Sequence, residues 1–214
     1  MKNLGSSLND SIASDNLVDL LANASDVGLD ALISSGALDG IPIFGTLRGT
    51  WKTVSDVRNY LYLRNIARFL QDLSTTSAED QTRFINLLKD RGEIERFGEN
   101  ILLLLDRIDD IEKPSIVCMI MAALVRDEIQ YEIAMRLSAI IGRCYAQDLS
   151  YLRTFKDGVQ GQMFEIAESL YSAGLLSMAG LDGGISENPN SGGTVFVLNQ
   201  YGKLLVKYGL PDVR

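Results

Sequence analysis

The sequence predicts a mainly α-helical fold, a multi-helix bundle followed by a C-terminal β-hairpin and a last helix. Three observations lead to this prediction. Apolar residues recur every three or four positions over most of the first 150 residues, which is the spacing of amphipathic helices. The stretch 114–125 is apolar nearly all round, as in a helix that is buried on most faces. Near the end, the run Thr194-Val-Phe-Val-Leu198 follows a loop rich in Gly, Asn, Pro and Ser, which is typical of the second strand of a hairpin.

Composition excludes several classes of function. The chain has 214 residues, 46% of them hydrophobic, so it is long enough to bury a large core in one or two domains. It has no histidine, which excludes nucleophiles activated by imidazole and most zinc and non-haem iron sites. Its net charge of -8 argues against general attraction to phosphate backbones. The two cysteines, Cys118 and Cys144, lie in apolar helical stretches and are expected to be buried, reduced thiols.

The first segment, residues 1–35, is expected to form two or three short amphipathic helices between Leu4 and Ile33. Polar residues interrupt its first ten positions, where a signal peptide would need an unbroken apolar core, so we expect a cytoplasmic protein. These helices can bury their apolar stripe either on the protein's own core or on a partner.

The next stretch, residues 36–48, combines a proline and three glycines with little charge. It is too short for a transmembrane helix, which needs about 20 predominantly apolar residues. Burial in the core is favoured. The alternative is contact with a membrane or a partner through four apolar side chains: Ile41, Ile43, Phe44 and Leu47. The glycines lack the Gly-Lys-Ser/Thr ending of a phosphate-binding loop, so no nucleotide cofactor is predicted.

The helical pattern is clearest between residues 50 and 151, and with the preceding stretch it defines a helical core over 36–155. Ser77 is placed to cap a helix through Asp80. The most hydrophobic part is expected to be a helical hairpin around a polar corner. Predicted helices begin at Thr50, Ser77, Glu93 and Pro114. A further helix follows the corner 126–130 and runs back to Tyr151.

Part of this core resembles a group of bacterial helical proteins to which no activity is assigned. The resemblance rests on Gly40-Ile-Pro-Ile-Phe-Gly-Thr-Leu47, the segment 60–70, Asn100-Ile-Leu-Leu-Leu-Leu-Asp-Arg-Ile-Asp-Asp110, and Ala122-Ala-Leu followed by Asp127-Glu-Ile. It covers about residues 30–155. It implies a helical cytoplasmic protein and no particular catalytic residue.

The C-terminal part, residues 156–214, has the order helix, strand, loop, strand, helix. Leu170-Tyr-Ser-Ala-Gly-Leu-Leu176, followed by Val195-Phe-Val-Leu-Asn-Gln-Tyr-Gly-Lys-Leu-Leu205, is similar to the end of many winged-helix domains. In a DNA-binding domain of that kind, the helix over 162–172 would enter the major groove. Here that helix has Glu165 and Glu168 and no basic residue, so binding of nucleic acid is not expected and binding of protein is favoured.

One acidic cluster is a weak candidate for a metal site. If they lie on a helix, Asp106, Asp109 and Asp110 share one face through i,i+3 and i,i+4 spacing. They could coordinate a hard cation if another element supplied further oxygens. Because Arg107 and Lys113 lie among them, a solvated charged face is favoured over a metal site.

No catalytic constellation and no small-molecule substrate emerge. The acids of the polar corner, Asp127, Glu128 and Glu132, could act as an acid/base pair only if a cleft desolvated one of them, and an exposed corner is favoured. The favoured hypothesis is a noncatalytic interaction, regulatory or scaffold protein of a bacterial cytoplasm, acting through a protein partner or self-association. The alternative is a membrane-acting effector of toxin or defence type that inserts the region 31–50 and is peripheral to the membrane. A third hypothesis is a winged-helix transcription regulator.

Overall fold

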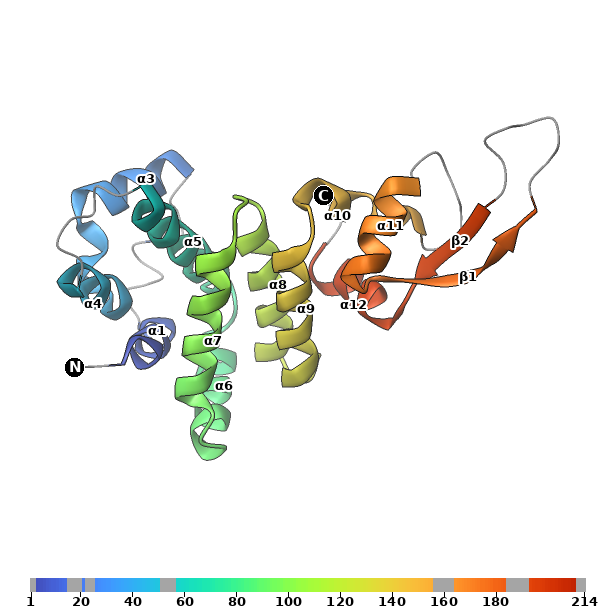
Figure 1. The fold of residues 1–214 in the computed structure, drawn as a ribbon. Coiled ribbons are helices and arrows are strands. Elements are labelled where there is room, and N and C mark those ends of the chain that lie inside the picture. The colour runs from blue at the N-terminus through green and yellow to red at the C-terminus, as the bar shows by residue number, and fades with distance from the viewer. Residues whose placement is uncertain are drawn as a thin grey trace. The chain divides into compact units, whose positions relative to one another are not determined.

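The computed structural model describes residues 3–14, 21, 26–50, 57–155, 164–183 and 193–210. Within these residues the protein is mainly helical and has one two-stranded antiparallel sheet near the C-terminus (Figure 1). The predicted fold class is therefore confirmed. The chain packs as two compact units, Met1–Gln130 and Tyr131–Arg214, and this division differs from the predicted boundaries at 35/36 and 155/156.

The first unit is helical throughout its described residues. Local signals set several helix ends as predicted: the Ser77 hydroxyl accepts the backbone N–H of Asp80, and Pro114 lies in the first turn of its helix. Residues 51–56 of the helix that was predicted from Thr50 lie outside the described residues, and the described portion ends at Leu73. The elements are α1 (Leu4–Ile12), α3 (Asp26–Ser35), η1 (Ala37–Gly40), α4 (Pro42–Thr50), α5 (Val57–Leu73), α6 (Ala78–Asp90), α7 (Ile94–Arg107) and α8 (Lys113–Val125).

Helix α8 is buried on nearly every face, as its uniformly apolar sequence predicts. It packs against α5, which presents Leu63, Ile66 and Phe69 from its buried side. Cys118 of α8 and Cys144, in the second unit, are both buried and unbridged, as predicted.

Helix α1 belongs to the first unit because it packs closely on α7 and α4. Its contact with α7 is a glycine crossing, where a Cβ added to Gly98 would overlap the backbone of Gly5. The buried side of α1 includes Ser7, Asn9 and Ser11 in addition to the predicted Leu8 and Ile12. This small and polar face joins α1 to the core, which is why the division of the chain does not fall at 35/36.

In the second unit, α9 packs on α12. The guanidinium of Arg136 lies over the ring of Tyr201, 5.5 Å from its centroid. The Ser169 hydroxyl donates to the Asp148 carboxylate at 2.6 Å, which ties α11 to α10. The elements are α9 (Tyr131–Arg143), α10 (Ala146–Ser150), η2 (Leu152–Phe155), α11 (Phe164–Ala173), β1 (Leu176–Asp182), β2 (Gly193–Leu198) and α12 (Gln200–Tyr208).

The helix, hairpin and last helix at the C-terminus have the predicted winged-helix-like order (Figure 1). Asn199 caps α12 by accepting the backbone N–H of Gly202 at 2.9 Å, and its amide donates to the carbonyl oxygen of Gly174 at 2.8 Å. Gly174 follows α11 with a φ of +93°, a left-handed conformation that favours glycine. Most of the predicted loop 182–193 lies outside the described residues.

The register of the hairpin places three cross-strand pairs on one face. Ala179, between Met178 and Gly180, has no partner on β2, and this β-bulge shifts the alternation of the strand by one position. The three pairs are Leu176 with Leu198, Met178 with Phe196, and Leu181 with Thr194.

Candidate functional site

The region proposed for membrane or partner contact lies in the core of the first unit. Four side chains are each at most 2% exposed: Ile41, Ile43, Phe44 and Leu47. Arg48, near the end of α4, joins this segment to the residues before it. Its guanidinium pairs with Asp39 at 2.8 Å and donates a hydrogen bond to the carbonyl oxygen of Ile33. Burial in the core, the favoured expectation, is therefore what the structure has. No helix in the described part of the chain is long and apolar enough to cross a membrane.

A chain of buried hydroxyl groups joins this region to α1. Ser11 Oγ accepts the backbone N–H of Ile43 at 2.9 Å and donates to the carbonyl oxygen of Ser7 at 2.7 Å. The hydroxyls of Ser7 and Thr46 lie 3.0 Å apart. Because Thr46 donates to the carbonyl oxygen of Pro42, the Ser7 hydroxyl is the donor in that pair. Ser11 thus satisfies one of the N–H groups that the first turn of α4 leaves without a helical partner.

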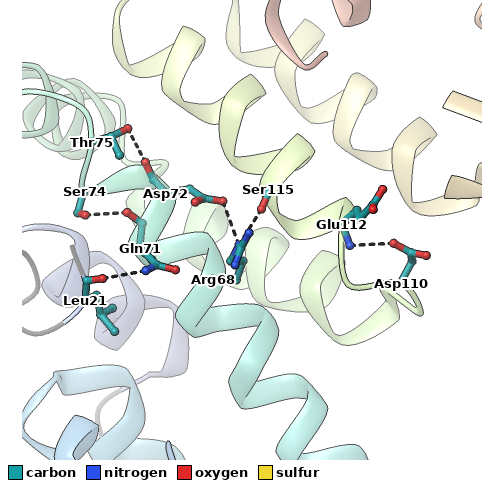
Figure 2. A network of polar contacts seen from close by, with 9 residues as sticks. All are labelled: Leu21, Arg68, Gln71, Asp72, Ser74, Thr75, Asp110, Glu112 and Ser115. Carbon is teal, nitrogen blue, oxygen red and sulfur yellow. Dashed lines mark hydrogen bonds and ion pairs between the residues drawn. The ribbon is translucent and has the colours of Figure 1, made fainter. Parts of the chain in front are cut away.

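The acidic cluster does not form the predicted helix face. Helix α7 ends at Arg107, so Asp109 and Asp110 lie in the turn before α8, and the expectation that they share a helix face with Asp106 is wrong. Each carboxylate instead has a different contact: Asp106 pairs with Arg58 at 3.0 Å, Asp109 pairs with Lys113 at 2.7 Å, and Asp110 accepts the backbone N–H of Glu112 at 2.8 Å, as Figure 2 shows for the last. Among the described residues, no group of three or more Cys, Asp or Glu gathers that could hold a metal ion.

The Asp109 contact stabilises a buried amine. The side chain of Lys113 is only 3% exposed, although Lys113 is the first residue of α8. Its ammonium group donates a hydrogen bond to the exposed carboxylate of Asp109, and this hydrogen bond lowers the pKa of Asp109. The pair therefore fixes the turn between α7 and α8, which is a structural role.

The polar corner after α8 is exposed, as expected. Arg126 and Glu128 form a surface ion pair at 2.9 Å. Asp127 has a φ of +62°, a conformation that Asp tolerates better than most residues. Since Asp127 and Glu128 are both open to solvent, neither has the desolvated surroundings that acid/base catalysis needs.

A polar network between α5 and α8 was not predicted (Figure 2). Arg68 Nε donates to Ser115 Oγ at 3.0 Å and lies 3.8 Å from the carboxylate of Asp72. Burial, and to a lesser extent the charge of Asp72, raises the pKa of the Cys118 thiol well above its usual value. A thiol in this state is protonated at neutral pH and is a poor nucleophile. The i,i+4 spacing of Arg68 and Asp72 is the one sequence signal that could have indicated it.

Exposed apolar side chains gather on α11 and the hairpin of the second unit. Phe164 and Tyr171 lie seven residues apart on α11 and both contact Phe196 of β2, with ring centroids 6.4 Å and 5.4 Å away. Phe164 is 47% exposed and Tyr171 is 40% exposed. On β1, Met178 is 58% exposed and Leu181 is 84% exposed. We call these five residues the α11–hairpin surface.

The register explains why the surface is exposed. The pair Leu176–Leu198 at the base of the hairpin is buried, and Phe196 in the next pair is covered by the two rings of α11. Figure 1 shows both strands continuing beyond α11, and among the residues that the structure describes no helix of the second unit lies over this further part of the hairpin. Met178 and Leu181 lie on that uncovered part.

The charges on this surface are acidic. Glu168 is exposed and lies one helical turn from both Phe164 and Tyr171, and Glu165 is exposed as well. The described residues of α11, β1 and β2 include no Lys or Arg. The alternation within β1 was the signal that could have identified Met178 as part of a continuous apolar face.

Comparisons with known proteins add no assignment to this surface. Neither a known protein family, nor a curated protein, nor a solved structure matches the chain. What the protein does therefore has to follow from its own residues.

Proposed function

We propose that the protein is a noncatalytic interaction protein that binds another protein through the α11–hairpin surface. The observation that carries the proposal is the exposure of Phe164, Tyr171 and Met178 beside the buried ring of Phe196. Leu181 extends this exposed apolar area further along the hairpin. Contiguous exposed apolar groups with polar residues beside them mark interaction sites on soluble proteins, and aromatic residues and Met are enriched at such sites.

The energetic gain on binding supports the proposal. Burying an exposed Leu or Met side chain contributes about 1.5–3 kcal/mol. Met178 and Leu181 are exposed over most of their surface, so covering both contributes about 2–4 kcal/mol before the entropic cost of association. The rings of Phe164 and Tyr171 already rest on Phe196 and are held in place before a partner arrives.

The membrane-acting alternative has less support. Insertion of the region 31–50 would take Ile41, Ile43, Phe44 and Leu47 out of the core, where each is at most 2% exposed. Because a membrane interior is about as apolar as the core, the insertion would gain little additional apolar burial for these side chains. It would also break the hydrogen bond from the backbone N–H of Ile43 to the hydroxyl of Ser11.

The proposal is tested with the double variant Met178→Ser/Leu181→Ser. The matched control is Leu103→Ser on α7, because Leu103 is a 55% exposed apolar residue in the first unit. Tagged full-length chains are used to capture partners from the native host, and bound proteins are quantified by mass spectrometry. We expect a partner that the wild type and the control retain and the double variant loses, with unchanged thermal melting of all three chains. Equal capture by the wild type and the double variant would refute the proposal.

Two further measurements on the wild type separate the other hypotheses. Leakage of dye from anionic vesicles would favour the membrane-acting effector. Binding to duplex DNA that weakens with added salt would favour the transcription regulator. We expect neither result.

A further inference from the structure

We infer that the α11–hairpin surface binds an amphipathic helix whose apolar stripe is flanked by Lys or Arg residues, supplied by another protein. The inference rests on the proposed function and goes further by assigning the chemistry and the secondary structure of the partner segment. Charge and dimensions support it, and the bulge makes the edge of β1 poorly suited to an extended partner.

The charge argument comes from α11. Glu168 lies between Phe164 and Tyr171 on the same side of the helix, and Glu165 is its exposed neighbour. A partner that covers the two rings brings Glu168 to the edge of a newly buried apolar area, where a carboxylate without a counter-charge is costly. The described residues of α11, β1 and β2 hold no basic residue, so a basic partner would supply the counter-charge that these three elements lack.

The dimensions fit a helix. Phe164 and Tyr171 are separated by seven helical residues, which corresponds to about 10 Å along α11. Met178 and Leu181 are three residues apart on β1, which also corresponds to about 10 Å. A partner helix with apolar residues at positions i, i+3 or i+4, and i+7 presents a stripe of the same length.

The edge of β1 is poorly suited to the main alternative, an extended segment that would add a third strand. Strand addition needs a regular row of backbone N–H and C=O groups. The bulge between Met178 and Gly180 interrupts that row, and Gly180 has a φ of +154°. Bulges of this kind protect edges from pairing. A helix that docks through its side chains does not use these backbone groups.

A second copy of the chain is also disfavoured as the occupant. In a symmetric dimer the same surface faces itself, so Glu165 and Glu168 of one copy would meet their equivalents. Both copies carry a net charge of -8, which adds general repulsion.

The experiment uses the full-length chain and two labelled helical peptides, each about four turns long, with leucines at positions i, i+3, i+4 and i+7. The remaining positions are lysine in one peptide and glutamate in the other. Binding is measured by fluorescence anisotropy at low and at high salt. We expect the lysine peptide to bind at least tenfold more tightly than the glutamate peptide, with a preference that shrinks as salt is added.

Variants separate local charge from the overall charge of the protein. Glu165→Lys/Glu168→Lys should abolish or reverse the preference for the lysine peptide. The matched control, Glu79→Lys/Glu95→Lys, changes the net charge equally on exposed positions of α6 and α7 and should keep the preference. If both variants change the preference to the same extent, or if neither peptide binds the wild type, the inference is overturned.

The apolar residues separate this inference from the proposed function. If Met178→Ser/Leu181→Ser weakens both peptides equally and the wild type shows no preference between them, the surface is an interaction site but its partner is not basic. If the double variant leaves peptide binding unchanged, the surface itself is wrong and the proposed function fails with it. Self-association in sedimentation that the double variant abolishes would overturn the inference in favour of a second copy.

Discussion

Replacement of Gly98 by alanine should destabilise the first unit by displacing α1 from α7. A Cβ at this position would overlap the carbonyl oxygen of Gly5 and lie 2.7 Å from the carbonyl carbon and the Cα of that residue. All three are backbone atoms, so no side-chain rotation can relieve the contact and α1 has to move. The hydrogen bond of 2.6 Å from the amide of the buried Asn9 to the carbonyl oxygen of Ile94 spans the same contact and would be strained or lost.

The magnitude follows from three terms. Overpacking a close contact costs about 1–3 kcal/mol, and a buried hydrogen bond that is broken costs about 1–3 kcal/mol. Alanine gains about 1 kcal/mol over glycine as a helix former, which acts in the opposite direction. The net expectation for Gly98→Ala is a loss of about 1–5 kcal/mol in the free energy of unfolding of the first unit.

The assay is urea denaturation combined with hydrogen exchange, because the two units can unfold separately and a single transition is not assured. We expect a lower denaturation midpoint and faster exchange in α1 and α7, with exchange in α11 and α12 unchanged. The matched control is Gly142→Ala on α9, where an added Cβ meets no atom within 4 Å. That variant should be as stable as the wild type or up to about 1 kcal/mol more stable. Wild-type stability of Gly98→Ala would show that the close crossing of α1 and α7 is not part of the fold.

Three further variants test other contacts. Asp109→Asn should lower stability by about 1 kcal/mol, a modest loss since the carboxylate is exposed, and Lys113→Met in the same chain should restore it. Folding lowers the pKa of Asp109, so the pair stabilises the fold at pH values above the unfolded pKa of about 4. This stability is lost as the pH falls through the folded pKa. In thermal melts from pH 2 to 7, the melting temperature of the variant should therefore fall less steeply with acid than that of the wild type. Ser11→Ala should cost about 1–3 kcal/mol in thermal melts, because it removes the acceptor of the backbone N–H of Ile43, and an unchanged melting temperature would contradict that. Gly202→Ala places a Cβ against the carbonyl oxygen of Leu175, the residue before β1. Hydrogen exchange should therefore accelerate across α11, the hairpin and α12. Exchange rates equal to those of the wild type would contradict the packing of α12 against this residue.

Helix ends were predictable where the signal is local. Ser77 and Asn199 each accept a backbone N–H from their own helix, so the residues that set the ends are adjacent in sequence. Pro114 acts through its own ring in the first turn of α8. These features depend little on the rest of the fold, which is why periodicity and capping rules find them.

The end of α7 was not predictable in this way. Apolar spacing extended the helix to Ile111, but the helix ends at Arg107 and Ile111 is 64% exposed. The amide of Asn65, forty residues earlier, donates to the carbonyl oxygens of Leu105 and Ile108 and so satisfies groups that a helix end leaves unpaired. A long-range contact of this kind has no signature near the end it stabilises, and the expected cluster of three aspartates failed for the same reason.

The position of α1 and the α11–hairpin surface were missed for opposite reasons. Hydrophobic periodicity counts Gly5 and Ser11 as neutral, so it cannot show that a small polar face is buried. It counts any apolar residue as a candidate for burial, so it cannot show that Met178 and Leu181 are exposed. In both cases burial depends on the distance to another element, which spacing along one element does not contain.

Affinity and selectivity at the α11–hairpin surface should depend on different residues. Met178 and Leu181 contribute through burial, which does not depend on the sign of the partner's charge. Glu168 is exposed and contributes through an ion pair at the protein surface, which is worth up to about 1 kcal/mol and less in salt. Removing the apolar pair should therefore weaken every helical partner to a similar degree, whereas reversing the glutamates should change which partner binds best. Charge mainly sets specificity and association rate at protein interfaces, so the second effect should appear chiefly in the association rate.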